Sequence, residues 1–276
     1  MKFISFISFT ALSTAIFAAP QLGTSHFERN EFHSLFSSFW SGVMIARPNE
    51  DMLWTHVTAH FIVPTPRDKK ASAVLAGVAI DNGVGEVRND AKIPSIATSI
   101  HIVTDEHGNT TYKPFYQWFP SPVAYFTSDS GGSKQPVIHP GDELTLGISM
   151  RVVHVGDEEK YVADARIANA RDGSFFTTTI NAPERDEIIG GNDAYFFASP
   201  PQPSDLLLNF GSIAFTKCAV ISDGDAPLSV DVSGVGLEDS ATHTPISFVN
   251  FSGNNLYGYS STPEGTSVQI AWKSGG

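Results

Sequence analysis

The stretch MLWTHVTAHFIV at residues 52–63 decides the fold class. Its apolar and polar side chains alternate, which is typical of a β-strand with one buried face. Pro64 and Pro66 follow and are expected to end the strand. The alternation places His56, His60 and Trp54 on one face. The other, core-facing side is expected to carry the residues at odd positions: Leu53, Thr55, Val57, Ala59, Phe61 and Val63.

The rest of the chain repeats this short-strand pattern between turn signals. The pattern predicts a hairpin in which the turn at residues 171–173 joins strands 161–169 and 174–180. Further strands are expected at residues 74–80, 97–103, 112–119, 145–153, 206–215, 246–251 and 267–272. No long amphipathic helix pattern occurs in the sequence. The chain is therefore predicted to be all-β, a β-sandwich or barrel, with one domain at residues 37–276.

Composition narrows the classes of partner. The 276 residues carry a formal net charge of -12, which repels phosphate backbones and argues against nucleic acid as a partner. Hydrophobic residues make up 41% of the chain, enough for a packed core. The single cysteine, Cys218, excludes an internal disulfide framework. It lies in the apolar run 215–220 and is expected to be a buried thiol.

The N-terminus has the pattern of a secretory signal. Lys2 precedes an apolar run at residues 3–17, and the small residues Ala18 and Ala19 follow. The run is too short to span a membrane, and no later stretch is long enough, so no membrane partner is expected. We predict a signal peptide at residues 1–19 and a short pro-segment or arm at residues 20–36. The sequons at Asn109 and Asn250 fit a secreted, extracellular glycoprotein.

The usual catalytic and metal-binding motifs are absent from the sequence. No zinc-protease, nucleophile-elbow or phosphate-loop pattern occurs, and no cofactor is predicted. His56 and His60 have the spacing of a metal pair on a helix. On a strand, however, four residues span about 13 Å, which is too far for one metal ion. We therefore predict two surface histidines and no metal site.

Seven segments, taken in order, resemble the glutamic peptidases, the eqolisin or A4/G1 family of secreted acid endopeptidases of fungi. FWSGV at 39–43 is similar to the family pattern N-W-x-G-x, and GVAIDN at 77–82 to W-V-G-I-D-G. FYQWFP at 115–120 is similar to W-Y-E-W-Y-P, and NDAYFF at 192–197 to N-A-E-x-I. The remaining segments are FIVP at 61–64, IHPGDE at 138–143 and the region 209–218. Together they cover about residues 37–225.

The resemblance implies a concanavalin A-like fold, a sandwich of two antiparallel sheets. It also implies that a peptide or protein ligand lies across the concave sheet. In the family a glutamate acts as general base on a water molecule. A glutamine amide orients that water and stabilises the oxyanion of the tetrahedral intermediate.

This sequence departs from the family at both catalytic positions. Ser199 falls where the glutamate belongs, and Ala97 falls where the glutamine belongs. A serine hydroxyl is not basic at acid pH, and alanine offers no hydrogen-bond donor. No glutamine occurs between Asp81 and Phe115, so a shift of alignment does not restore the amide. Glu184 and Glu187 lie upstream of the glutamate position but match no motif.

The family cleft is expected to retain other residues of this chain. Phe115, Gln117 and Phe119 share one face of their strand, opposite Tyr116 and Trp118. In the family orientation the first set, with Asp81, lines the substrate-binding cleft. The alternatives are core packing for the aromatic residues and a turn role for Asp81.

Three functions remain open at this point. Loss of a general base costs about 10²- to 10⁴-fold in rate, and loss of an oxyanion donor about 10²- to 10³-fold. The first function is therefore a catalytically impaired protein that binds peptides in its cleft. The second is an active acid endopeptidase with relocated residues, such as Gln117 and a loop carboxylate. The third is a carbohydrate-binding module with a glycan ligand.

Overall fold

The structure is a computed structural model built from β-strands. It describes residues 34–37, 40–47, 52–67, 70–81, 95–119, 121–127, 136–156, 158–182, 191–201, 207–223, 229–231, 238–239, 244–253, 256–261 and 268–274. None of these residues forms a helix that is long and apolar enough to cross a membrane. The predicted signal peptide and pro-segment lie outside the described residues, apart from the short strand that begins at residue 34.

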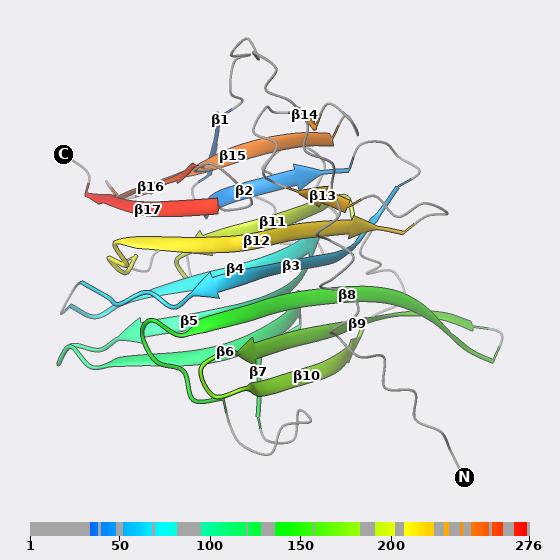
Figure 1. The fold of residues 1–276 in the computed structure, drawn as a ribbon, viewed down its shortest axis with the longest axis horizontal. Helices are drawn as coiled ribbons and strands as arrows, with labels where there is room; N and C mark the ends of the chain where they lie inside the picture. The colour runs from blue at the N-terminus through cyan, green and yellow to red at the C-terminus, as the bar shows by residue number, and fades with distance from the viewer. Residues whose placement is uncertain are drawn as a thin grey trace.

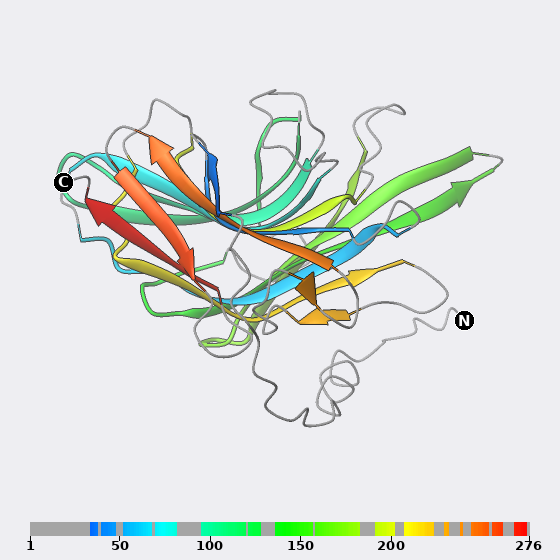
Figure 2. The ribbon, with the colours of Figure 1, turned by 90° about the horizontal axis from the view of Figure 1, so that it is seen from above.

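The strands form two layers, visible edge-on in Figure 2. Sheet one runs in the order β1 (Ser34–Ser37), β15 (Thr244–Gly253), β2 (Ser41–Ala46), β11 (Asp193–Ser199), β4 (Ser72–Asp81), β5 (Ser95–Thr104), β6 (Thr110–Phe119), β7 (Ala124–Tyr125). Sheet two runs in the order β16 (Leu256–Ser261), β17 (Val268–Ser274), β12 (Ser212–Ser222), β3 (Trp54–Ile62), β8 (Glu143–Val155), β9 (Glu158–Asn169), β10 (Ser174–Asn181). The short strands β13 (Ser229–Asp231) and β14 (Glu238–Asp239) pair with β12 and β15.

The pairing is antiparallel throughout these named strands except for β1 against β15 (Figure 1). The pairing of β15 with β16 joins the two layers at one edge. The predicted all-β, antiparallel two-sheet β-sandwich is therefore confirmed. The predicted hairpin is also confirmed, since β9 and β10 pair from Asn169 and Ser174 onward.

The core lies between the two sheets and is built by the predicted alternation. In sheet two, Val57, Ala59 and Phe61 of β3 are fully buried. The Phe215 ring on β12 packs 5.4 Å from that of Phe61 and 6.3 Å from that of Phe196 on β11, between ring centroids. Phe196 belongs to sheet one, so these rings join the two layers. Burying three such side chains contributes several kcal/mol to stability.

The position of Trp54 differs from the one predicted for the strand at residues 52–63. Alternation placed it on the outer face, but its side chain is fully buried in the core. Along β12, Ser222 pairs with Trp54 and Ile221 pairs with His56, so Thr55 is an extra residue in β3. A bulge of this kind reverses the alternation on one side of it. The reversal turns Trp54 toward the core.

The predicted strand 206–215 is wrong at its start, because β12 begins at Ser212. Leu207 makes an isolated bridge to Ala73, and the chain then turns. Gly211 has a φ of 67°, and its N–H donates to Asn209 Oδ1 at 3.1 Å. A left-handed glycine held by an asparagine side chain is a turn, which interrupts the apolar run.

Asp142, in the segment 138–143, stabilises the turn that leads into β8 of sheet two. Its carboxylate is 3% exposed. It accepts hydrogen bonds from the His139 N–H at 2.9 Å, Asn169 Nδ2 at 2.9 Å and Arg171 Nη1 at 3.0 Å. Burial acts to raise the pKa of Asp142, but the three hydrogen bonds and the Arg171 charge outweigh it and hold the pKa below its usual value. This segment therefore has a structural role.

Candidate functional site

The face of sheet one that points away from the core carries four cross-strand rows of residues. Their registers follow from the pairing of β11 with β4, β4 with β5 and β5 with β6. In that strand order the rows are Asp193–Asp81–Ser95–Phe119, Tyr195–Ala79–Ala97–Gln117, Phe197–Gly77–Ser99–Phe115 and Ser199–Leu75–His101–Lys113. Side chains of one row are neighbours across the sheet, so the rows show which residues can act together.

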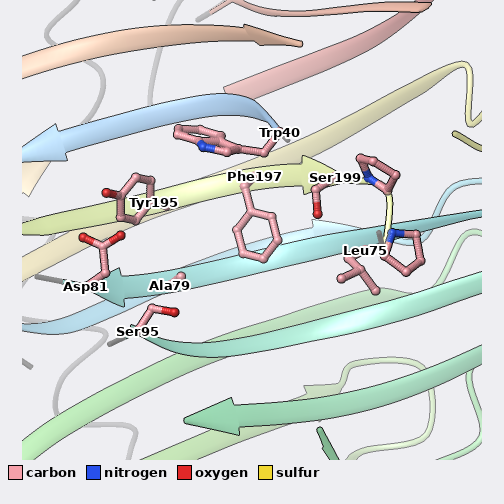
Figure 3. A pocket seen from close by; sticks show the side chains of 10 residues that line it. Trp40, Leu75, Ala79, Asp81, Ser95, Tyr195, Phe197 and Ser199 are labelled. Atoms are coloured by element: carbon pink, nitrogen blue, oxygen red, sulfur yellow. The ribbon is translucent and has the colours of Figure 1, made fainter. Parts of the chain in front are cut away.

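A pocket of about 250 Å³ opens on this face along β11 and β4 (Figure 3). The rings of Trp40 and Tyr195 form one wall, packed edge to face with their centroids 5.2 Å apart. The small side chain of Ala79 leaves space beside them. The lining residues are Trp40, Leu75, Ala79, Asp81, Ser95, Tyr195, Phe197, Ser199, Pro200 and Pro201.

One end of the pocket is acidic. Asp81 lies directly opposite Asp193 in the β4–β11 register, and Figure 3 shows its carboxylate beside Tyr195. The Tyr195 hydroxyl donates to Asp193 Oδ2 at 3.3 Å. Asp193 is 2% exposed, so the two carboxyl groups and the phenol form a compact, largely desolvated cluster.

The environment of Asp193 favours its neutral form. Burial is the main cause that raises its pKa to about 7, and the negative charge of Asp81 adds to it. The Tyr195 hydrogen bond and the positive charge of Arg47 act in the opposite direction. Burial, followed by the two carboxylates, also raises the pKa of Tyr195. Asp193 therefore keeps its proton through the acid range up to about pH 7, which suits proton transfer.

The two positions assigned to the family's catalytic pair are not neighbours. Ser199 lines the pocket and lies opposite Leu75. Ala97 lies in the row of Tyr195, with Ala79 between them. The rows of Ser199 and Ala97 are four residues apart, about 13 Å along the strand, and two strand spacings of about 4.8 Å separate them sideways. The structure does not bring these positions together around one water molecule.

The other predicted cleft residues divide between the pocket and its surroundings. Asp81 lines the pocket. Phe115, Gln117 and Phe119 lie on the same sheet face, three strands away from β11, while Trp118 points into the core. Phe115 is 2% exposed, and its ring lies 6.4 Å from that of Tyr125.

Gln117 has a structural partner. Its Nε2 donates to the Ser121 carbonyl at 2.9 Å and fixes the turn after β6. This bond uses one of the two N–H donors of the amide. Glu184 and Glu187, the other carboxylates considered for relocation, lie outside the described residues.

Sequence reasoning did not identify Trp40, Tyr195 or Asp193 as site residues. Trp40 and Tyr195 were noticed only as parts of motifs. A usable signal was present in residues 193–199, where Asp193, Tyr195, Phe197 and Ser199 alternate with apolar residues. Such alternation places an acid, two rings and a hydroxyl on one face of a strand.

The two histidines of β3 lie on the outer face of sheet two, far from the pocket in the sheet order. His56 Nδ1 lies 2.6 Å from Ser149 Oγ, and His60 Nδ1 lies 2.7 Å from Glu143 Oε1. Burial and then the charge of Arg166 lower the pKa of His56 to about 4. Across the part of the chain that the structure describes, no three His, Cys, Asp or Glu side chains converge as metal ligands. Cys218 is buried, as predicted.

The sandwich of two antiparallel sheets places the protein in the concanavalin A-like fold class. Comparison with known families then shows to which family within this class the chain belongs. The Peptidase A4 family matches residues 38–272, so the chain belongs to this family, that of the eqolisins. No curated protein matches the chain.

Two solved structures share the fold. The first is scytalido-glutamic peptidase with a peptide-based transition-state analogue, at 18% identity and a TM-score of 0.55. The second is SCP-B, a member of the eqolisin family, in complex with the tripeptide Ala-Ile-His, at 18% identity and a TM-score of 0.52. Each match covers 85% of this chain and 98% of the other chain. The predicted family resemblance is confirmed.

Proposed function

We propose that this protein is a secreted eqolisin-type protein that binds peptides on the outer face of sheet one and has impaired peptidase activity. The observation that carries the proposal is the pocket on β11 and β4, which combines aromatic rings with a carboxylate. Pockets of this kind hold ligands by apolar contact and fix their orientation with a few polar groups. Both structural neighbours were solved with peptide ligands, which supports a peptide as the ligand here.

The impairment follows from the residues at the catalytic positions. Ser199 supplies no base, and Ala97 supplies no amide. The amide of Gln117 donates to the Ser121 carbonyl. A peptide in the pocket would therefore meet neither an activated water nor an oxyanion donor from these residues.

An active acid endopeptidase remains a second candidate because of one observation. Asp81 and Asp193 are paired at the pocket, and Asp193 holds a proton up to a pH of about 7. Two carboxyl groups with different protonation states can act as acid and base. This candidate requires that hydrolysis depends on Asp81. A glycan ligand is the third candidate, since the aromatic pocket wall could also pack against a sugar ring.

Binding without turnover is the expected result for the purified protein. A fluorescent peptide library should bind in anisotropy titrations at pH 3 to 7, while mass spectrometry detects no cleavage in the presence of pepstatin. Cleavage that disappears in the Asp81→Asn variant would replace the proposal with the relocated enzyme. Binding to a glycan array, without any peptide binding, would establish the carbohydrate-binding alternative.

Secretion and glycosylation are part of the same proposal. Asn109 is exposed in the turn between β5 and β6, where an oligosaccharide transferase can reach it. Asn250 lies within β15. We expect a eukaryotic secretory host to release the protein into the medium, without residues 1–19 and with a glycan on Asn109. Endoglycosidase treatment should lower its mass, and Asn109→Gln should remove that shift. Retention of the protein inside the cells would contradict the proposal.

A further inference from the structure

The pocket has the chemistry of a site for organic cations. We propose that it binds the positively charged group of a peptide, an alkylammonium or guanidinium, between the rings of Trp40 and Tyr195 and the carboxylate of Asp81. This inference rests on the proposed function only in taking the ligand to be a peptide. The ring faces and the carboxylate attract the same charge, so their contributions add at one place.

The aromatic wall is fixed before any ligand arrives. The Trp40 and Tyr195 rings are perpendicular, with an angle of 85° between their planes. Two rings at right angles form a corner, and a cation placed in it can lie over the face of one ring while the other limits its movement. Cations bound to aromatic faces in this way are favoured most where water is excluded. Tyr195 is also held by its hydrogen bond to Asp193, so little side-chain entropy is lost on binding.

The charge at the acidic end of the pocket favours a cationic ligand. Asp81 lines the pocket, and Asp193 lies behind it in the same row. Among the described residues, the titratable groups that act on Asp193 are Asp81, Tyr195 and Arg47, and Arg47 brings the one opposing charge. Above a pH of about 7 Asp193 is mostly ionised beside Asp81, which adds negative charge at this end of the pocket. A cationic ligand offsets that charge.

The size and the remaining lining match a side chain rather than a bare ion. A volume of about 250 Å³ is several times the roughly 30 Å³ that one water molecule occupies in the liquid. Beyond the acidic end, the lining is mostly apolar, with Leu75, Phe197, Pro200 and Pro201. The methylene groups of a lysine or arginine could pack there while the charged end reaches Asp81.

The test compares peptides with and without a positively charged group at pH 7, where lysine, arginine and a free N-terminus are mostly protonated. The probes are Ac-Ala-Ala-Xaa-Ala-Ala-NH2 with lysine, arginine or norleucine at Xaa, plus the norleucine peptide with an unblocked N-terminus. Titration calorimetry should show lysine or arginine binding about tenfold tighter than the blocked norleucine peptide. Tighter binding of the unblocked norleucine peptide would identify the N-terminal ammonium as the preferred source of the charge.

Three variants locate the effect. Asp81→Asn keeps the shape of the side chain and removes its charge, and it should reduce the preference for the charged probes. Glu106→Gln removes the same charge from an exposed turn and should keep the preference. Trp40→Leu should weaken the charged probes about fivefold more than the blocked norleucine probe. Thermal unfolding of each variant checks that it is folded. If a variant fails to fold, the inference is judged on the affinities of the wild-type protein for the charged and neutral probes.

The outcomes separate this inference from the proposed function. Equal binding of the charged and neutral peptides would overturn the cation site and leave peptide binding intact. If no peptide binds, the proposed function fails, and small molecules then decide the inference. In that case n-butylammonium chloride should raise the unfolding temperature more than n-butanol does at the same concentration, an effect that Asp81→Asn reduces. Equal shifts would overturn the cation site.

Discussion

The Gly42→Ala substitution is expected to lower the free energy of unfolding by about 4 kcal/mol, enough to prevent stable folding of many domains. Gly42 lies in β2, between β11 and β15, with a φ of 156°. A Cβ at this position would overlap the carbonyl oxygen of Phe196 and lie 2.9 Å from Phe197 Cα. Both obstacles are backbone atoms of the neighbouring strand, so no rotamer change relieves them. The strand that carries the pocket would have to move away.

Gly147→Ala provides the matched control for that experiment. Gly147 lies in β8 of sheet two, and the nearest atoms to its added Cβ would be 3.6 Å away, an ordinary contact. We expect this variant to stay within about 1 kcal/mol of the wild type. Urea unfolding followed by tryptophan fluorescence measures both variants. Equal stability of the two variants would show that β2 and β11 do not approach as closely as the structure indicates.

The contribution of Asp193 to stability is expected to fall as the pH rises from about 4 to about 7, while His56, whose pKa is lowered from 6.5 to about 4, contributes the opposite slope. The pKa of Asp193 is raised from the usual 3.8 to about 7 in the folded protein. Between these values the folded state holds a proton that the unfolded state has lost, so raising the pH favours unfolding. The slope is about 1.4 kcal/mol per pH unit, which amounts to roughly 4 kcal/mol over the interval. Above pH 7 both states are ionised and the slope vanishes.

The Asp193→Asn variant should lose this slope, because asparagine resembles the protonated acid and does not titrate. Asp172→Asn is the control, since Asp172 lies in the exposed turn between β9 and β10, and its variant should keep the slope. Urea midpoints measured at half-unit intervals from pH 4 to 8 give the comparison. Equal pH dependence of the wild type and the Asp193→Asn variant would contradict the assignment.

Asp142 gives the opposite pH dependence on the acid side. Its pKa is lowered in the folded protein, so its contribution is present above about pH 4 and is lost as the pH falls below that value.

The architecture could be predicted from the sequence because it depends on local alternation. Residues in β3, β8 and β9 alternate so regularly that their buried face is readable without a structure. Trp54 shows the limit of this reasoning. The bulge at Thr55 depends on pairing with β12, more than 150 residues later, and no local pattern records it. The predicted strand 206–215 begins too early for a different reason. The Asn209–Gly211 turn interrupts an apolar run that otherwise resembles a continuous strand.

The site was less predictable, because it depends on register between distant strands. Motif similarity assigned Ala97 and Ser199 to one catalytic centre. Which residues face each other is decided by hydrogen bonds between β11, β4 and β5, and these set Ala97 in the row of Tyr195, with Ala79 between them. A catalytic pair must meet in space, and sequence order alone does not show that it does. The acidic pair of Asp81 and Asp193 was missed for the same reason.

The single thiol of this chain can serve as a built-in reporter of motion. Cys218 lies in β12 with 2% of its surface exposed. A thiol-reactive dye can therefore modify only those molecules in which sheet two has transiently separated. The labelling rate, measured without denaturant, then gives the frequency or the free energy of that opening, depending on whether closing or modification is faster. Since the sequence contains no second cysteine, every labelling event reports on the same strand.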